Sequence, residues 1–238
     1  SKSKNDPKIF RFSCCLKENI DKNKLNIALQ KTLDEYPIFK SSLKKGVFWY
    51  YLEETNKNFT AKEETKSPCS DFSGNHLFEV TYYKKRINFE VFHVLTDGTG
   101  ATEFLKELVK NYLYLVHKEE GLEQITLLPE DMTVQDQEDD SFLKYYSKNQ
   151  KRPKKRKLNA FQIRRKKKDG NHLHVHESVV SVQAVLKRSR ELGVSMTIFL
   201  TALFMMAINE EMSKMQKKKP VVLMVPVNLR KFFPSSSM

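Results

Sequence analysis

The stretch Arg86-Ile-Asn-Phe-Glu-Val-Phe-His-Val-Leu-Thr-Asp-Gly-Thr-Gly-Ala-Thr-Glu-Phe-Leu105 changes its hydrophobic period along its length. The first part alternates as a β-strand does, with one face made of Ile87, Phe89, Val91, His93 and Leu95. The second part opens a helical pattern, with Glu103 in its first turn and apolar residues at Leu105, Leu108, Val109, Tyr112 and Val116. The sequence therefore predicts a strand that leads into a long helix.

A short connection, Asp97-Gly98-Thr99-Gly100, separates the predicted strand from the predicted helix. We expect it to need unusual backbone angles, which Gly98 and Gly100 would tolerate. His93 then lies at the end of an apolar strand, beside a sharp turn and close to the start of a helix. An imidazole in that position would be fixed and partly desolvated, as a proton-transferring group requires.

The length, composition and net charge of the chain limit its number of domains and its class of partner. A chain of 238 residues can bury a sizeable core, as one large domain or two smaller ones. Hydrophobic residues make up 39% of it, which is typical of a globular protein. The net charge of +13 favours polyanionic partners, namely nucleic acid, a membrane surface or a phosphorylated cosubstrate. Charge alone does not choose among these three.

The cysteines and the longest apolar run predict a cytoplasmic protein without a membrane span. Cys14, Cys15 and Cys69 are odd in number and have no metal-ligand spacing, and the adjacent pair would point to opposite faces of a strand. A disulfide framework is therefore not expected, which fits a reducing compartment. We find no secretion signal pattern. The run 196–208 is too short for a bilayer, which needs about 20 residues, so we expect a buried helix there.

Patterns along the first half predict several further elements. Residues 8–16 are expected to form an opening strand, and a helix capped by Asp21 or Asn23 should end before Pro37. An extended piece over 38–43 and an aromatic strand over 47–52 follow. A hairpin over 77–83 and 87–95 is expected to turn at Lys84 and Lys85.

A change of composition predicts a boundary near residue 150. The acidic segment 121–140 is followed by two basic runs, Lys151–Lys157 and Arg164–Lys168. Beyond them the sequence predicts, in order, a strand over 172–180, a helix over 182–192 ending at Gly193, a central helix over 196–215, and a strand over 221–225 buried on both faces.

Three motifs together resemble a known superfamily. Phe92-His93-Val94-Leu95-Thr96-Asp97-Gly98 is similar to the HHxxxDG motif of the chloramphenicol-acetyltransferase-like superfamily, which includes condensation domains, wax-ester synthases and alcohol acetyltransferases. The segment 36–43 resembles the "HPxLR" segment of these proteins, with Lys40 where arginine is usual. The segment 225–230 resembles their "PVxxR" segment. The alcohol-acetyltransferase-like branch is the most similar, because phenylalanine can precede the histidine there too.

The resemblance implies an α/β fold, a chloramphenicol-acetyltransferase-like (condensation-domain-like) two-layer sandwich with a mixed sheet and flanking helices. Members consist of two similar halves and are about twice as long, and a later DFGWG-like motif has no counterpart in this chain. Residues 1–150 then correspond to the N-terminal subdomain, which carries the HxxxDG motif. Residues 151–238 correspond to a linker and the first part of the C-terminal subdomain, so that the pseudo-two-fold second half is incomplete.

The same resemblance implies an acyltransferase that moves an acyl group from a thioester to a hydroxyl or amine. Acetyl-CoA or another acyl-CoA would be a cosubstrate, with no tightly bound cofactor and no metal. His93 would be the catalytic general base. Asp97 is expected to be structural and paired with Arg230, while Gly98 and Gly100 would form the active-site loop. Candidate substrate-binding residues are Asn228 and Phe92.

Two alternative functions stay open from the sequence. One is a condensation-type domain that uses carrier-protein thioesters, and the other is a non-catalytic basic module that binds nucleic acid or another ligand. His172, His174 and His176 alternate on the predicted strand 172–180, and we favour an exposed strand face over a zinc site there. The two basic runs favour a solvated linker, because no aromatic residues interleave with them regularly.

Overall fold

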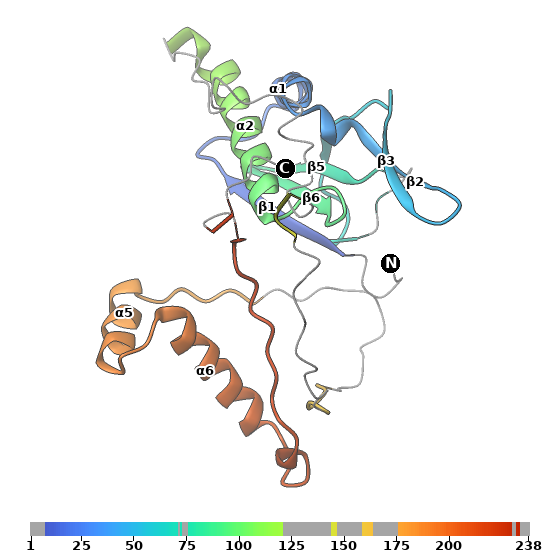
Figure 1. Ribbon diagram of the computed structural model, residues 1–238. Helices are drawn as coiled ribbons and strands as arrows, with labels where there is room; N and C mark the ends of the chain where they lie inside the picture. Colours follow the sequence, from blue (N-terminus) through green and yellow to red (C-terminus); the bar gives the residue numbers. More distant parts are fainter. Residues whose placement is uncertain are drawn as a thin grey trace. The chain divides into compact units, whose positions relative to one another are not determined.

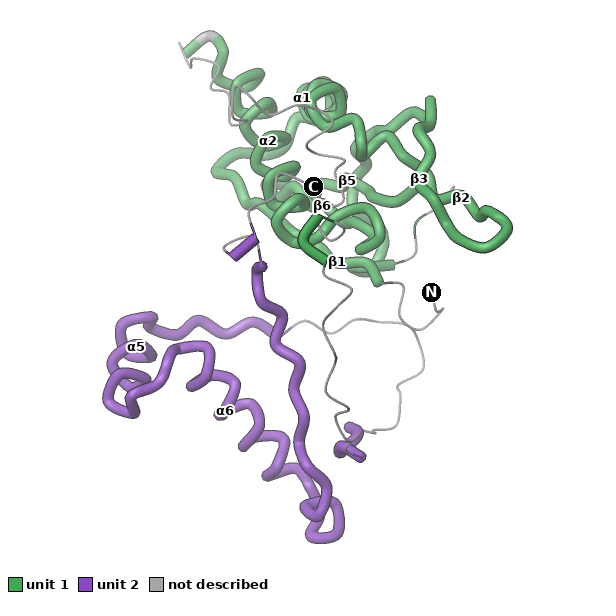
Figure 2. Tube along the Cα trace, viewed as in Figure 1, with its two compact units in different colours: residues 1–146, 171–173, 234–238 green, residues 147–170, 174–233 purple. Residues whose placement is uncertain are grey.

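A computed structural model describes residues 8–70, 72, 76–120, 144–146, 159–163, 176–229 and 232–233. The chain divides into two compact units, which Figure 2 shows in different colours. Unit 1 comprises residues 1–146, 171–173 and 234–238, and unit 2 comprises residues 147–170 and 174–233.

A four-stranded mixed sheet forms the centre of unit 1 (Figure 1). Its strand order is β1 (Ile9–Cys15), β6 (Arg86–Phe92), β5 (Phe78–Tyr83) and β4 (Lys62–Glu63). The pairs β1–β6 and β5–β6 are antiparallel, whereas β4 pairs with β5 in parallel. β5 and β6 form the predicted hairpin, and Lys84 adopts a positive φ of 51° in its turn. The predicted α/β fold class with a mixed sheet is confirmed.

Two helices, α1 (Lys22–Glu35) and α2 (Gly98–His117), pack against one apolar face of this sheet (Figure 1). The strand register aligns Phe12 with Phe89, and Phe89 with Val80, so that this face is apolar across three strands. Phe39, from the short 3-10 helix η1 (Pro37–Lys40), packs against Phe104 of α2 with ring centroids 4.2 Å apart. The core of unit 1 therefore lies between the helices and this face.

The opposite face of the sheet carries a network of charged side chains. The guanidinium of Arg11 donates to Glu90 at 2.6 Å and to Glu64 at 2.5 Å, and Arg86 donates to Glu64 at 2.7 Å. Burial acts to raise the pKa of Glu64. Hydrogen bonds and charge from Arg11 and Arg86 outweigh that effect, so that its pKa lies below the usual value. The network joins β1, β6 and the segment that follows β4.

A second, two-stranded sheet pairs β2 (Ser41–Lys45) with β3 (Tyr50–Glu54). The predicted extended piece over 38–43 is wrong in its first part, because Pro37–Lys40 forms the 3-10 helix. The aromatic strand predicted over 47–52 begins only at Tyr50. The reason is a tight turn, in which the backbone N–H of Gly46 donates to the carbonyl of Trp49 at 2.7 Å.

Unit 2 contains the helices α5 (Val182–Glu191) and α6 (Met196–Glu210) and a 3-10 turn, η3 (Gln216–Lys218). α5 ends at Glu191 and is followed at Gly193 by the left-handed φ of 66° that favours glycine, so the predicted glycine stop is confirmed. The hydroxyl of Ser195 caps α6 by accepting from the N–H of Ile198 at 3.3 Å. α6 stops at Glu210, five residues before the predicted end at 215.

Three predictions for unit 2 are wrong. α6 was expected to be buried, but none of its residues is buried, and Phe204 is 56% exposed. Residues 221–225 form no strand, and Met224 is 93% exposed. The described part of the predicted strand over 172–180, residues 176–180, is also irregular and exposed. Among the described residues of unit 2 no strand is assigned, so these apolar side chains have no sheet to pack against.

Within the described residues, no single helix is long and apolar enough to cross a membrane. Only α5 and α6 taken together have the length and apolar composition of a membrane span, and they are bent by 89° at the break between them.

Candidate active site

The candidate site begins where β6 ends. The strand stops at Phe92, and a turn over 93–95 follows, closed by the N–H of Leu95 donating to the carbonyl of Phe92 at 2.9 Å. Ile87, Phe89 and Val91 are fully buried on the predicted apolar face. His93 lies in the turn and is exposed, so its ring is more open to solvent than its predicted place on the apolar strand face implied. The cause is the early end of the strand, which takes His93 off the packed face.

Two contacts with the start of β1 hold His93. Its backbone N–H donates to the carbonyl of Lys8 at 2.9 Å, which extends the β1–β6 pairing by one residue. Its imidazole lies against the ring of Phe10, with the centroids 4.9 Å apart and the planes inclined at 56°. Phe10 is itself half-buried against the core. The imidazole is therefore supported by Phe10 while it stays open to solvent.

Asp97 is the N-cap of α2. Its carboxylate accepts from the N–H of Thr99 at 2.9 Å and from that of Gly100 at 3.0 Å. This cap satisfies two of the unpaired donors at the helix start and places a negative charge at the positive end of the helix dipole. Asp97 thereby fixes the junction between the turn of His93 and the helix.

The predicted need for unusual backbone angles at the junction is wrong. Gly98 and Gly100 lie within the first turn of α2 and neither has a positive φ. A Cβ atom on Gly98 would meet no atom within 4 Å, whereas Gly100 is buried. Because α2 begins at Gly98, Glu103 falls in its second turn and not in the first. The connection is a capped helix start rather than a glycine turn.

The other predicted site residues are distributed over both units. Phe92 is 7% exposed, so its side chain is packed within the protein rather than displayed at the site. Asn228 lies in unit 2 and is exposed on a segment without regular structure. Arg230 falls outside the described residues, and its pairing with Asp97 stays a prediction. The two basic runs, His172 and His174 also lie outside the described residues, and His176 is exposed.

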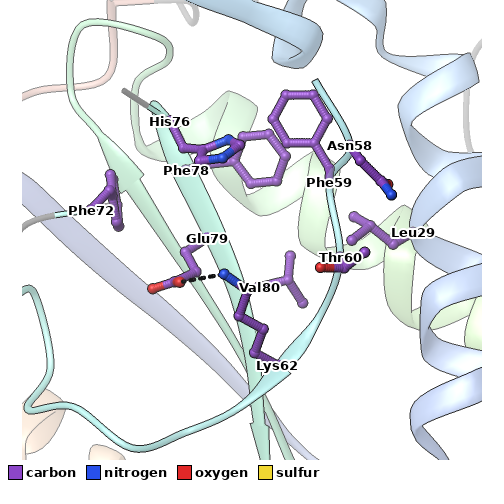
Figure 3. Close-up of a pocket in the computed structure, with 10 residues that line it drawn as sticks. All are labelled: Leu29, Asn58, Phe59, Thr60, Lys62, Phe72, His76, Phe78, Glu79 and Val80. Carbon is purple, nitrogen blue, oxygen red and sulfur yellow. Dashed lines mark ion pairs between the residues drawn. The ribbon is translucent and has the colours of Figure 1, made fainter. Parts of the chain in front are cut away.

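A cavity of about 30 Å³ lies beside β5 and the segment before β4, as Figure 3 shows. The ring of His76, a residue that no sequence motif indicated, packs edge-on against Phe59 with centroids 5.3 Å apart. Burial lowers the pKa of His76, and the charges of Lys57 and Lys62 lower it further. The cavity has room for only a few water molecules, so it is not a candidate for a substrate site.

A larger cavity of about 120 Å³ lies against the charged face of the sheet. Its lining includes Arg11, Glu64 and Glu90 of the network together with Lys62 and Lys66. His93 lines neither of these two cavities.

The alcohol acetyltransferase family model matches residues 78–238, more than half of the chain. The chain belongs to the alcohol acetyltransferase family. The match confirms the resemblance inferred from the HxxxDG-like motif and from the segment 225–230, both of which lie within the matched range. The segment 36–43 precedes it. A comparison with curated proteins gives no match.

Several solved structures resemble this alcohol acetyltransferase family member over part of their length. The starter condensation domain of rhizomide synthetase RzmA shares 12% identity, over 50% of this chain and 34% of that domain, with a TM-score of 0.41. SgcC5 from Streptomyces globisporus shares 14% identity, over 52% and 32%, with a TM-score of 0.40. Polyketide synthase associated protein 5 from Mycobacterium tuberculosis shares 14%, over 51% and 32%, with a TM-score of 0.39. The aligned part of the chain thus spans about a third of each of these structures.

Proposed function

We propose that this protein is an acyl-CoA-dependent O-acyltransferase, with acetyl-CoA as the preferred donor and a small alcohol as the acceptor. The observation that carries the proposal is the imidazole of His93. The imidazole is exposed, and one side of it contacts the ring of Phe10. It lies at the strand-to-helix junction of a chain that belongs to the alcohol acetyltransferase family.

The proposed reaction is a direct transfer. The imidazole of His93 accepts the proton of the acceptor hydroxyl while that oxygen attacks the thioester carbonyl. The carbon–sulfur bond then breaks, and the imidazolium returns the proton to the departing thiolate. The products are an ester and free coenzyme A, and no acyl-enzyme is formed. Such base catalysis typically contributes about 10²–10⁴-fold, so positioning of both substrates supplies the remaining acceleration.

The surroundings of His93 support this role in two ways. An exposed ring can meet a substrate without first displacing a packed side chain. Its position is nevertheless restrained, because the Lys8 carbonyl holds the backbone and Phe10 supports the ring. We assign Asp97 as a positioning residue, since its carboxylate caps α2 at the far end of the same turn. The pairing of Asp97 with Arg230 is part of the proposal.

The test is an assay of thiol release from acetyl-CoA with a series of short alcohols, combined with detection of the ester. We expect ester formation by the 238-residue chain and its loss in His93→Ala. An acyl-pantetheine thioester on a carrier protein, offered in parallel, tests the condensation-type alternative. Absence of turnover with either donor, together with steeply salt-dependent binding of DNA, would contradict the proposal and favour the binding-module alternative.

A further inference from the structure

The tip of the β2–β3 hairpin exposes five consecutive large apolar and aromatic side chains. Val47 is 86% exposed and Phe48 is 87% exposed, and Trp49, Tyr50 and Tyr51 are exposed at 66%, 63% and 45%. We call residues 47–51 the aromatic tip. Figure 1 shows the hairpin standing out from the helices and the main sheet of unit 1. Single exposed apolar residues are ordinary on soluble proteins, but a contiguous group of this kind marks an interaction surface.

The charge next to the aromatic tip is positive. Lys44 and Lys45 directly precede the turn, and no acidic residue occurs between Ser41 and Leu52. Glu53 of β3 lies across the hairpin from this pair and contacts Lys44 at 3.4 Å, with both side chains about half exposed. The whole chain carries a net charge of +13. The partner of this surface is therefore expected to be apolar where the tip enters and anionic beside it.

We propose that the aromatic tip docks on the surface of an anionic lipid bilayer. Tryptophan and tyrosine prefer the membrane–water interface, where an apolar ring and a polar edge are both accommodated. Lys44 and Lys45 meet the anionic headgroups at the same level. Apolar insertion and basic attraction together give the two signals that stable membrane attachment requires.

The geometry of the tip sets the expected depth. A hairpin pairs its backbone groups only along the two inner edges, and unpaired backbone groups are costly in hydrocarbon. Insertion is therefore shallow, with Val47 and Phe48 entering between headgroups and Trp49 at the interface. A protruding tip suits a fluid surface that closes around it, whereas a protein partner would have to supply a matching groove. This inference does not depend on the proposed acyl transfer.

Trp49 provides a direct probe, because it is the only tryptophan in the chain. The 238-residue chain is mixed with vesicles of phosphatidylcholine alone or with added phosphatidylserine, and tryptophan emission is recorded. We expect a shift to shorter wavelength with the phosphatidylserine vesicles, and quenching when brominated lipids are included. Tryptophan emission is the decisive signal because exposed apolar residues of α6 could also carry the chain onto vesicles.

Two variants test the two parts of the surface. Val47→Ser with Phe48→Ser keeps Trp49 as the probe and should weaken partitioning about tenfold or more. Lys44→Gln with Lys45→Gln should weaken it about thirtyfold, and added salt should have a similar effect. The matched control is Ile27→Ser, which removes a 57% exposed side chain from α1 and should leave partitioning unchanged.

Three results would overturn the inference. The first is tryptophan emission that does not respond to anionic vesicles. The second is vesicle binding that both tip variants retain in full, which would place the contact elsewhere. The third is a spectral shift that grows with protein concentration in the absence of vesicles, which would make the tip a contact between two copies of the chain.

Discussion

The imidazole of His93 lies against the ring of Phe10, with the ring centroids 4.9 Å apart. Phe10 belongs to β1, and His93 directly follows the neighbouring strand β6; the hydrogen bond from His93 N–H to the Lys8 carbonyl fixes their relative position. The pairing of β1 with β6 thus brings the ring of Phe10 against the imidazole of His93, the proposed general base.

Removing the aromatic support should impair catalysis more than binding. In Phe10→Ala the imidazole of His93 loses its contact on one side, and we expect kcat to fall about tenfold with KM nearly unchanged. Phe10→Leu, which keeps an apolar side chain, should lose less. Steady-state kinetics on the three proteins provide the measurement, and an unaltered kcat in Phe10→Ala would show that Phe10 does not position the imidazole.

Loss of the α2 cap should affect both stability and activity. Asp97→Ala removes the acceptor of two backbone hydrogen bonds, and we expect the free energy of unfolding to fall by about 1 kcal/mol. Asp21→Ala is a matched control, because Asp21 caps α1 in the same way, accepting from Asn23 and Lys24. Both variants should lose similar stability in urea denaturation, but only Asp97→Ala should lose activity. Equal activities would make Asp97 an ordinary helix cap.

The charged network should make unit 1 sensitive to acid. The pKa of Glu64 is lower in the folded state than its ordinary value of 4.5, because Arg11 and Arg86 outweigh the effect of burial. The unfolded chain therefore takes up the proton first as pH falls. The stabilisation is present above about pH 4.5 and is lost as the pH falls further, through the folded pKa.

Glu64→Gln tests this dependence. It removes the partner that Arg11 and Arg86 share and should cost about 2 kcal/mol at neutral pH, because Arg11 keeps Glu90 and Arg86 is partly exposed. It should also flatten the acid limb of a plot of unfolding free energy against pH. Glu103→Gln, which breaks an exposed pair with Lys106, should cost about 0.5 kcal/mol or less. Equal losses in the two variants would show that the network contributes little.

Alkali should destabilise unit 1 through Tyr36. Burial, then the charges of Glu103 and Glu35, raise the pKa of this tyrosine to about 12. Between about pH 10 and 12 the unfolded chain loses this proton while the folded chain keeps it, so stability falls as pH rises, by about 3 kcal/mol in total. Unfolding free energies of Tyr36→Phe should lack this component. A slope that persists in the variant would assign the effect to other groups.

The local patterns of the first half could be predicted from the sequence. Alternation predicted the hairpin of β5 and β6, and helical spacing after a cap at Asp21 or Asn23 predicted α1, which Asp21 caps. The HxxxDG-like motif together with the segments 36–43 and 225–230 also led to the correct family. Each of these features depends on residues close together in the chain, where propensity and period are sufficient.

The incorrect predictions concern features that depend on contacts between residues far apart in the sequence. The apolar alternation of the sequence continues through His93 and Leu95, but β6 ends at Phe92. A turn follows at once, and Asp97 then caps α2, which begins at Gly98. The apolar composition of α6 and of residues 221–225 predicted burial, yet burial needs partner elements that the described residues do not supply. The charged network was not foreseen, because Arg11, Glu64 and Glu90 are distant in sequence and meet only through strand pairing.

The central claim is that the imidazole of His93 removes the proton of the acceptor. Its most direct test is the initial rate of ester formation by His93→Ala, with and without added free imidazole. We predict a rate about 10²–10⁴-fold below that of the wild-type chain, with partial recovery as imidazole is raised, because the exposed site admits it. A His93→Ala variant that forms ester at the wild-type rate would contradict the account.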